Sequence, residues 1–189
     1  MKRNFLTVAR LLYDKGYSEL VAASKIIKPR YRDVMFHWVG GMDEGYPEFV
    51  TPKQIILDQD AGYLRYHGYT RDVKEYMQKA DCIILPSYHE GMSRTLMESL
   101  AMGKPVITSD IPGCREAVEE GKNGFLCRPK DTDSLVAAIE KFLSLSELQI
   151  EEMGRFSRRK AEMEFDVEKV IEFYDKILGE QFGDLYKKN

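Results

Sequence analysis

Two glutamates, Glu90 and Glu98, flank a segment that leaves a short apolar run, passes Gly91 and enters a helical pattern. Residues eight apart on a helix are about 12 Å apart along its axis. A retaining glycoside hydrolase needs its two carboxylates roughly 5 Å apart, so the spacing instead suits an extended ligand held at both ends. One carboxylate would bind sugar hydroxyls and the other ribose hydroxyls. Two ordinary solvent-exposed glutamates would give the same pattern, and an isolated pair is therefore a weak motif.

The residues between these glutamates add a site for negative charge. A helical pattern spans 92–102, and the start of a helix presents free backbone N–H groups and the positive end of its dipole. Gly91 has no side chain and lets a ligand approach the backbone closely. The segment Gly91, Met92 and Ser93 therefore predicts an anion site that a diphosphate would fit.

The elements that must position these residues are short apolar runs that alternate with helical patterns. The expected strands span 5–8, 35–39, 63–67, 82–85, 105–108 and 124–126. The expected helices span 18–28, 52–60, 73–80, 92–102, 114–120, 131–143 and the chain from 147 onward. Short apolar strands that each lead into a helix indicate a parallel sheet covered on both faces. The predicted fold is α/β, a doubly wound Rossmann-like domain that binds ligands at the carboxyl ends of its strands.

Composition excludes several other classes of function. The 189 residues suit one α/β domain, and 28 Lys and Arg against 31 Asp and Glu give a net charge of −3. That balance argues against a nucleic-acid partner, which would require a basic excess. The three cysteines, Cys82, Cys114 and Cys127, form no CxxC motif and predict neither a disulfide framework nor a zinc site. Nothing near Cys114 marks its thiol as reactive.

Targeting signals are also missing from the sequence. The first residues, MKRNFLTVARLLYDKG, contain no apolar core of a signal peptide, and no apolar run has the length of a membrane span. We therefore expect a cytoplasmic protein with reduced thiols.

Several ordered motifs resemble one enzyme family. The stretch 85–105, LPSYHEGMSRTLMESLAMGKP, resembles the signature of glycosyltransferase family 4, which has the GT-B fold. The stretch 106–116, VITSDIPGCRE, and the Asn-Gly-Phe at 123–125 are similar to the same family, as are Ala-Arg-Leu at 9–11 and Lys-Gly at 15–16. The likeness is strongest to the branch that builds capsules and O-antigens. It covers nearly the whole chain and favours a functional role for both glutamates.

The resemblance implies a role for each matching residue. The family transfers a sugar from a nucleotide donor with retention of configuration, without a metal or another cofactor. Glu90 would contact the donor sugar and is the catalytic candidate, while Glu98 would bind the ribose. Arg10 and Lys15 would neutralise the diphosphate, which is the leaving group. The remaining donor-binding candidates are Gly91, Met92 and Ser93 at the β-phosphate and sugar, and Tyr69 at the base.

Other features have ordinary interpretations. Tyr69 equally fits an exposed or half-buried tyrosine without a function. The triplet 58–60, Asp-Gln-Asp, mimics a metal-binding motif but lies in a helical pattern, so we expect a helix surface. His89 is expected to be structural, and the basic run Arg155, Arg158, Arg159 and Lys160 to be a solvated helix face.

The family fold has two Rossmann-like domains, and the chain resembles the C-terminal one. We expect residues 1–189 to form one nucleotide-sugar-binding domain that includes terminal helices at 147–189. The N-terminal acceptor domain would be absent, so the fragment alone would be an inactive part of a hexosyltransferase. The expected donor is a UDP-sugar, the acceptor a polysaccharide or lipid-linked sugar, and membrane contact would come through the missing domain. The alternatives are a free-standing nucleotide-sugar-binding module and an epimerase fragment, although the EGMS and PGCRE segments argue against the epimerase.

Overall fold

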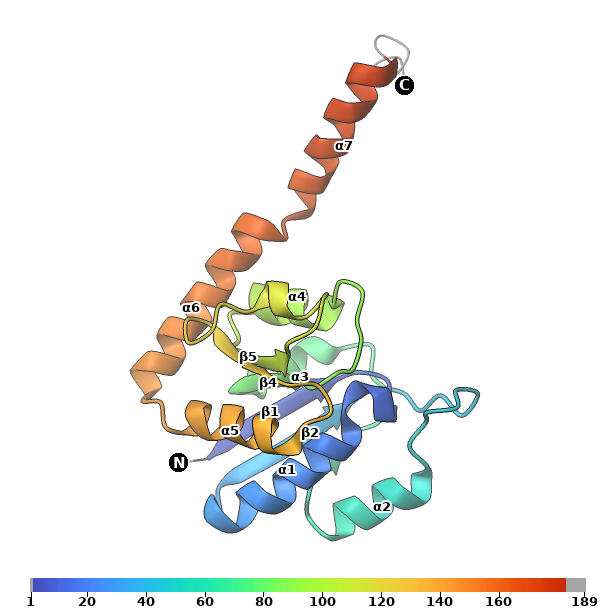
Figure 1. Ribbon diagram of the computed structural model, residues 1–189, viewed down its shortest axis with the longest axis vertical. Coiled ribbons are helices and arrows are strands. Elements are labelled where there is room, and N and C mark those ends of the chain that lie inside the picture. The colour runs from blue at the N-terminus through green and yellow to red at the C-terminus, as the bar shows by residue number, and fades with distance from the viewer. Residues whose placement is uncertain (1, 183–189) are drawn as a thin grey trace.

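A parallel sheet forms the centre of the molecule in the computed structural model, which describes residues 2–182. Within these residues the strand order is β3-β2-β1-β4-β5-β6, and every pair is parallel (Figure 1). The strands are β1 (Arg3–Val8), β2 (Val34–Val39), β3 (Arg65–Tyr66), β4 (Cys82–Leu85), β5 (Val106–Ser109) and β6 (Gly124–Cys127). This order confirms the predicted doubly wound fold. The strand predicted at 63–67 is reduced to two residues at the edge of the sheet.

Helices cover both faces of this sheet. Figure 1 shows α1, α2 and α5 on one face and α3 and α4 on the other. The α-helices described are α1 (Tyr17–Arg30), α2 (Pro52–Asp60), α3 (Val73–Lys79), α4 (Arg94–Ala101), α5 (Thr132–Leu143), α6 (Glu147–Glu164) and α7 (Val167–Phe182). The helix predicted at 114–120 is wrong in extent, because only the 3-10 turn Arg115–Ala117 forms there.

Local capping explains where several helices begin. Thr51 accepts a hydrogen bond from the backbone N–H of Gln54 and precedes a proline at the first helical position of α2. Asp131 accepts in the same way from the N–H of Ser134 at the start of α5. Ser146 and Gln149 form a reciprocal capping box at the start of α6. These caps satisfy N–H groups that a helix cannot bond internally.

Two hydrophobic clusters fill the space on either side of the sheet. On the α1 and α5 face, Phe5 stacks on Phe36 with ring centroids 5.3 Å apart, and Phe142 packs edge-on against Phe5. On the α3 and α4 face, Met77 and Leu96 pack over residues of β1, β4 and β5. Because β4 is buried along its whole length, its carboxyl end is held firmly where the next loop begins.

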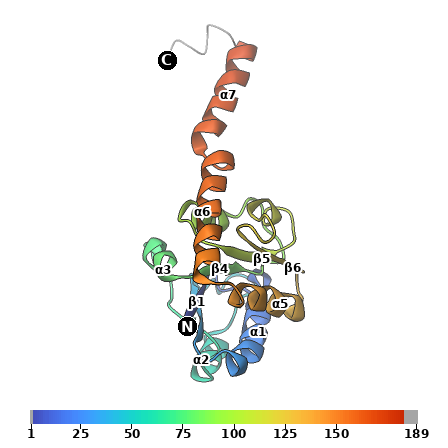
Figure 2. The same ribbon diagram turned by 90° about the vertical axis from the view of Figure 1, so that its left-hand side faces the viewer.

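The end of the chain forms two consecutive helices. α6 packs along α4, and α7 extends away from the sheet (Figures 1 and 2). The predicted terminal helices are therefore present through residue 182, with a break between Glu164 and Val167. The remainder of the predicted range, 183–189, lies outside the described residues. In the part of the chain that is described, no helix combines the length and apolar character needed to cross a membrane.

Two polar residues expected on helix surfaces are buried. Tyr17 donates from its hydroxyl to Asp58 Oδ2 at 2.8 Å, and Gln54 donates to the same oxygen at 2.8 Å. Burial, together with this Asp58 hydrogen bond, raises the pKa of Tyr17. The prediction of a helix surface is therefore wrong for Asp58. It is also wrong for Lys160, which is 8% exposed and donates to Glu164 at 2.7 Å.

Candidate functional site

The strand order changes direction between β1 and β4, and the crevice of a doubly wound sheet opens at that point. The loop after β1 and the loop after β4 meet there. The backbone N–H of Tyr88 donates to the carbonyl of Asp14 at 2.8 Å, and the Ser87 hydroxyl donates to the same oxygen at 3.3 Å. The sheet therefore brings together two segments that are more than 70 residues apart in the sequence.

Gly16 allows these two loops to pack closely. Its φ of +79° is a left-handed conformation, and a Cβ added there would lie 2.2 Å from the carbonyl oxygen of Pro86. Any side chain at Gly16 would push the loops apart and displace the residues that they carry.

Lys15 and Glu90 form an ion pair across the two loops. The Nζ of Lys15 lies 2.9 Å from Oε1 of Glu90, and the two side chains are 15% and 17% exposed. Partial burial strengthens such a pair relative to one on an open surface. The Lys15 ammonium has three N–H donors, so it can bind an anion while it still holds Glu90. The structure thus places the predicted phosphate-binding lysine against the predicted sugar-binding glutamate.

Asp14 is a buried carboxylate beside this pair that the sequence analysis missed. Its Oδ2 lies 3.3 Å from Nε2 of His89, whose side chain is 70% exposed. Its Oδ1 is buried and has no hydrogen-bond partner among residues 2–182. Asp14 directly precedes the matching Lys-Gly pair at 15–16, but no spacing in the sequence indicates that its side chain turns inward. The contact with His89 supports the structural role expected for that histidine.

The start of α4 is held by the loop that follows β5. The backbone N–H of Ser93 donates to the carbonyl of Gly113 at 3.2 Å, and Thr95 donates from its hydroxyl to the Val8 carbonyl at 2.9 Å. A Cβ on Gly113 would lie 1.5 Å from the Gly91 carbonyl oxygen, so the two loops are in direct contact.

These contacts determine which N–H groups of the predicted anion site are free. The N–H of Ser93 is already engaged with the Gly113 carbonyl. In residues 2–182, no hydrogen bond uses the N–H groups of Gly91 and Met92. The predicted phosphate contact therefore has its unused donors at Gly91 and Met92, while Ser93 fixes the loop.

Glu98 lies on α4, one helix turn after Arg94. Its side chain is 45% exposed, and its Oε1 is 3.5 Å from the Arg94 guanidinium. Because α4 begins at Arg94, Glu90 belongs to the preceding loop and the two glutamates are not on one helix. The 12 Å separation expected for two helical positions therefore does not describe this pair.

Arg10 and Tyr69 lie apart from the Lys15–Glu90 pair. Arg10 donates to Asp43 Oδ2 at 2.8 Å and stacks over the Tyr46 ring at 5.0 Å, and its side chain is half exposed. Tyr69 is 72% exposed in the loop beyond β3. The structure gives neither residue a contact with Lys15 or Glu90, so a ligand would have to link them.

Other chemistry at this edge of the sheet is limited. Burial raises the pKa of the Cys114 thiol to about 11, so the thiol stays protonated at neutral pH and is a poor nucleophile. Across the described residues, no cluster of three or more His, Cys, Asp or Glu side chains is arranged to hold a metal ion.

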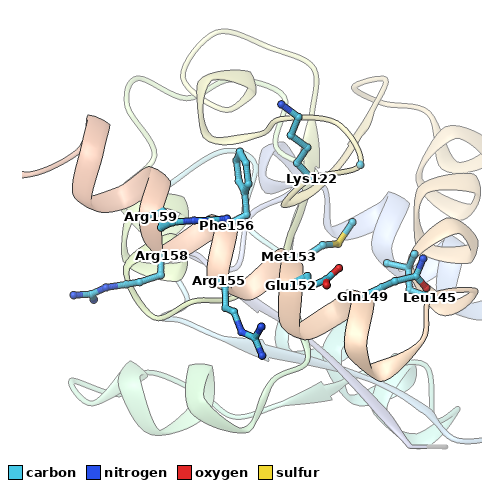
Figure 3. A pocket seen from close by; sticks show the side chains of 10 residues that line it. Lys122, Leu145, Gln149, Glu152, Met153, Arg155, Phe156, Arg158 and Arg159 are labelled. Atoms are coloured by element: carbon cyan, nitrogen blue, oxygen red, sulfur yellow. The ribbon is translucent and has the colours of Figure 1, made fainter.

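A hollow of about 810 Å³ lies elsewhere, between α6 and the turn before β6 (Figure 3). Its cations are mostly neutralised by their own neighbours, since Arg155 pairs with Glu151 at 3.3 Å and Arg158 with Glu162 at 2.7 Å. These two arginines form the solvated helix face expected from the sequence. The hollow contains none of the residues predicted to bind a donor.

Comparison with known proteins identifies the family. Residues 1–161 match the family described as glycosyl transferases group 1. The chain belongs to this family. The resemblance inferred from the motifs is thereby confirmed, and so is the fold class, a Rossmann-like half of a GT-B fold.

Individual relatives of this glycosyl transferase chain are longer proteins. The N,N'-diacetylbacillosaminyl-diphospho-undecaprenol alpha-1,3-N-acetylgalactosaminyltransferase of Campylobacter jejuni is 27% identical over 92% of the chain and 44% of the relative. The amylovoran biosynthesis glycosyltransferase AmsK of Erwinia amylovora is 30% identical over 85% and 40%. HepE of Anabaena, solved in complex with UDP-glucose, superimposes with a TM-score of 0.81 at 22% identity, over 95% of the chain and 49% of HepE. The chain spans about half the length of the curated relatives it matches.

Proposed function

We propose that the chain is the donor-binding domain of a retaining glycosyltransferase. It would hold a nucleotide-sugar, a UDP-sugar, whose sugar is moved to a polysaccharide or lipid-linked acceptor. The observation that carries this proposal is the Lys15–Glu90 ion pair at the carboxyl edge of the sheet, beside the start of α4. In this pair a cation suited to phosphate and a carboxylate suited to sugar hydroxyls lie 2.9 Å apart.

The proposed chemistry separates a sugar from a diphosphate. The bond between the anomeric carbon and the diphosphate oxygen breaks, and its electron pair leaves with the nucleoside diphosphate. The acceptor hydroxyl oxygen forms the new bond to that carbon, and its proton passes to an oxygen of the departing diphosphate. Lys15 and the N–H groups of Gly91 and Met92 would stabilise the negative charge that develops on the leaving group. Glu90 would hold the sugar hydroxyls at the reacting carbon, and Glu98 the ribose.

The named relatives support the choice of donor and acceptor. The structural relative HepE was solved with UDP-glucose. The name of the Campylobacter relative describes a sugar-diphosphate-undecaprenol acceptor, and AmsK is named for synthesis of the polysaccharide amylovoran. Retention of configuration and transfer of a hexose rest on the family motifs. We also propose donor binding without a metal, because a lysine and backbone N–H groups would meet the charge of the phosphates.

The proposal assigns the acceptor to another domain. Since the chain spans about half of its relatives, we infer that residues 1–189 act as one donor-binding unit next to an acceptor-binding half. The isolated unit would bind the donor and would not transfer the sugar. The enzyme would work in the cytoplasm, with membrane contact made by the other half.

Calorimetry on the 189-residue chain tests the proposal. UDP and UDP-sugars are titrated into the wild type and into Lys15→Ala, with Lys53→Ala as a matched control, because Lys53 is an exposed lysine on α2. We expect binding by the wild type and the control and strong loss in Lys15→Ala. A chain that binds no nucleotide, or one that binds equally well without Lys15, would contradict the proposal. A parallel assay should detect no transfer to an acceptor, and efficient transfer would contradict the division into two halves.

A further inference from the structure

A second cavity lies on the α3 face of the sheet, with a volume of about 400 Å³. This volume falls within the range of roughly 300–1,000 Å³ that is common for small-molecule sites. None of the residues assigned to donor binding lines it. Two histidines, His37 and His67, line it, and the proposed function gives neither of them a role.

The register of the strands explains why these side chains meet. Leu6 of β1 pairs with His37 of β2, and His37 pairs with Arg65 of β3, so the three lie in one row across the sheet. Side chains two residues apart on a strand share a face. Asn4 and His67 therefore point to the same side as this row. The helix α3 covers that side of the sheet and supplies Glu75, Tyr76 and Lys79.

The two histidines form a coupled pair. Nδ1 of His37 lies 2.9 Å from Nε2 of His67, the rings stack with centroids 5.2 Å apart, and Tyr76 packs against His67. A hydrogen bond between two ring nitrogens requires one donor and one acceptor. A neutral pair satisfies this requirement, and a pair that has taken up one further proton satisfies it as well.

Cations surround this pair without an equal number of carboxylates. Lys79 pairs with Glu75, the one carboxylate among the residues that line the cavity. Within residues 2–182, Lys2 and Arg65 have no ion-pair partner. Both side chains are exposed, and two like charges at one cavity without a counter-charge favour the binding of an anion.

Burial, and to a lesser extent nearby charges, disfavours protonation of both histidines. Burial, followed by the charges of His67, Arg65, Lys2 and Lys28, lowers the pKa of His37 to about 4. Burial and Arg65 lower the pKa of His67 as well. A bound anion would offset the cations and make protonation of the pair easier. The charged and titratable groups facing the pair are Lys2, Lys28, Arg65, Glu75, Tyr76 and Lys79.

We propose that this cavity is a second binding site, separate from the donor site, for a small dianion of the phosphate-monoester class. Lys2 and Arg65 supply the attraction. Because His37 contacts His67 through Nδ1 and Asn4 through Nε2, the ring nitrogen left for the anion is Nδ1 of His67, which takes up a proton when the anion binds and donates a hydrogen bond to it. Binding of a ligand that stays a dianion should therefore tighten as the pH falls, whereas a phosphate monoester loses its second charge below about pH 6. The inference does not depend on the proposed transferase function, because no donor-site residue takes part.

Nuclear magnetic resonance of the isotope-labelled chain tests this site. Sulfate is the first probe, titrated against chloride at equal ionic strength, because it stays a dianion over the whole pH range. We expect the imidazole signals of His37 and His67 to shift in a saturable way and the measured pKa of His67 to rise in sulfate. No saturable shift of either imidazole would overturn the proposal.

Three variants distinguish specific binding of sulfate in the cavity from nonspecific attraction of an anion to a positively charged surface. Arg65→Gln should weaken sulfate binding roughly five- to tenfold, as expected for the loss of one nearby charge. Lys74→Gln removes the same charge from an exposed position on α3 that does not line the cavity, and it should change affinity by less than about twofold. Glu75→Gln removes the carboxylate and should tighten binding. Equal weakening by Arg65→Gln and Lys74→Gln, or weakening by Glu75→Gln, would contradict the site.

A final arm distinguishes a soluble ligand from a lipid. Methyl phosphate should compete with sulfate and give the same histidine shifts. Vesicles that contain phosphatidic acid carry the same chemical group on a membrane. Binding to such vesicles that is lost in Arg65→Gln, without any response to methyl phosphate, would overturn the assignment to a small soluble ligand.

Discussion

Removing Lys15 should affect UDP binding more than the loss of a single contact. In Lys15→Ala the diphosphate loses a charged hydrogen bond, which contributes about 1.5–3 kcal/mol. The same change leaves the Glu90 carboxylate, 17% exposed, without its partner and close to the phosphates. Repulsion from that carboxylate adds to the loss. We therefore expect a total cost of about 2–4 kcal/mol, a roughly 30- to 1,000-fold weaker affinity for UDP.

The reverse substitution should act differently. Glu90→Ala frees the Lys15 ammonium from its partner at 2.9 Å. UDP affinity should stay nearly unchanged or rise slightly, because UDP has no sugar for Glu90 to hold. A UDP-sugar should lose whatever affinity it has beyond that of UDP. In the full-length enzyme turnover should fall further, because this contact lies at the carbon where bonds change.

The double variant gives the sharpest comparison. Lys15→Ala combined with Glu90→Ala removes both charges, so no stranded carboxylate repels the diphosphate. It should bind UDP more tightly than Lys15→Ala alone, although less tightly than the wild type. Calorimetry on all four proteins gives the coupling energy, and thermal melting checks that each one is folded. If the double variant binds UDP no better than Lys15→Ala, the ion pair does not have the role assigned to it.

Three further predictions concern Glu98, the need for a metal, and two glycines, of which Gly113 borders the site and Gly62 lies between α2 and β3. Glu98→Ala should weaken UDP and UDP-sugar alike by about 1.5–3 kcal/mol in calorimetry, and unequal losses would contradict the ribose contact. EDTA should leave UDP affinity unchanged, so abolished binding would reveal a metal requirement. Gly62→Ala should lower the free energy of unfolding in urea by about 1–2 kcal/mol because its φ is +74°. Gly113→Ala should cost more, since its Cβ would also lie 1.5 Å from the Gly91 carbonyl; equal costs would disprove the contact.

The sequence predicted elements well where the local signal was complete. The apolar run Cys82–Leu85 is β4 without change of bounds, and the amphipathic pattern at 131–143 forms α5 behind the Asp131 cap. The pattern at 114–120 failed because Val118 is extended, and because the Asn123 side chain donates to the Ala117 carbonyl and accepts from the Glu119 N–H. Edge strand β3 pairs with β2 only at Arg65 and Tyr66, and the Tyr66 N–H donates instead to the side chain of Gln59.

The site was predictable in its residues and less so in their contacts. The motifs placed Lys15 and Glu90 in loops after strands, and parallel strands bring such loops to one edge. Their ion pair joins residues 75 apart in the sequence. A contact over that distance cannot be predicted from the spacing of apolar residues. The partner of Arg10, Asp43, and the inward turn of Asp14 depend in the same way on tertiary packing. Asp58 was misjudged because its partner, Tyr17, comes from a distant helix.

Backbone amide shifts on addition of a UDP-sugar test most directly whether the carboxyl edge of the sheet is the donor site. The free N–H groups of Gly91 and Met92 should shift strongly and saturably, together with the amide of Lys15. The amides of Lys122 and Met153, which line the hollow beside α6 (Figure 3), should not move. Strong shifts at Lys122 and Met153, with none at Gly91 and Met92, would contradict the assignment and place the nucleotide on the opposite edge.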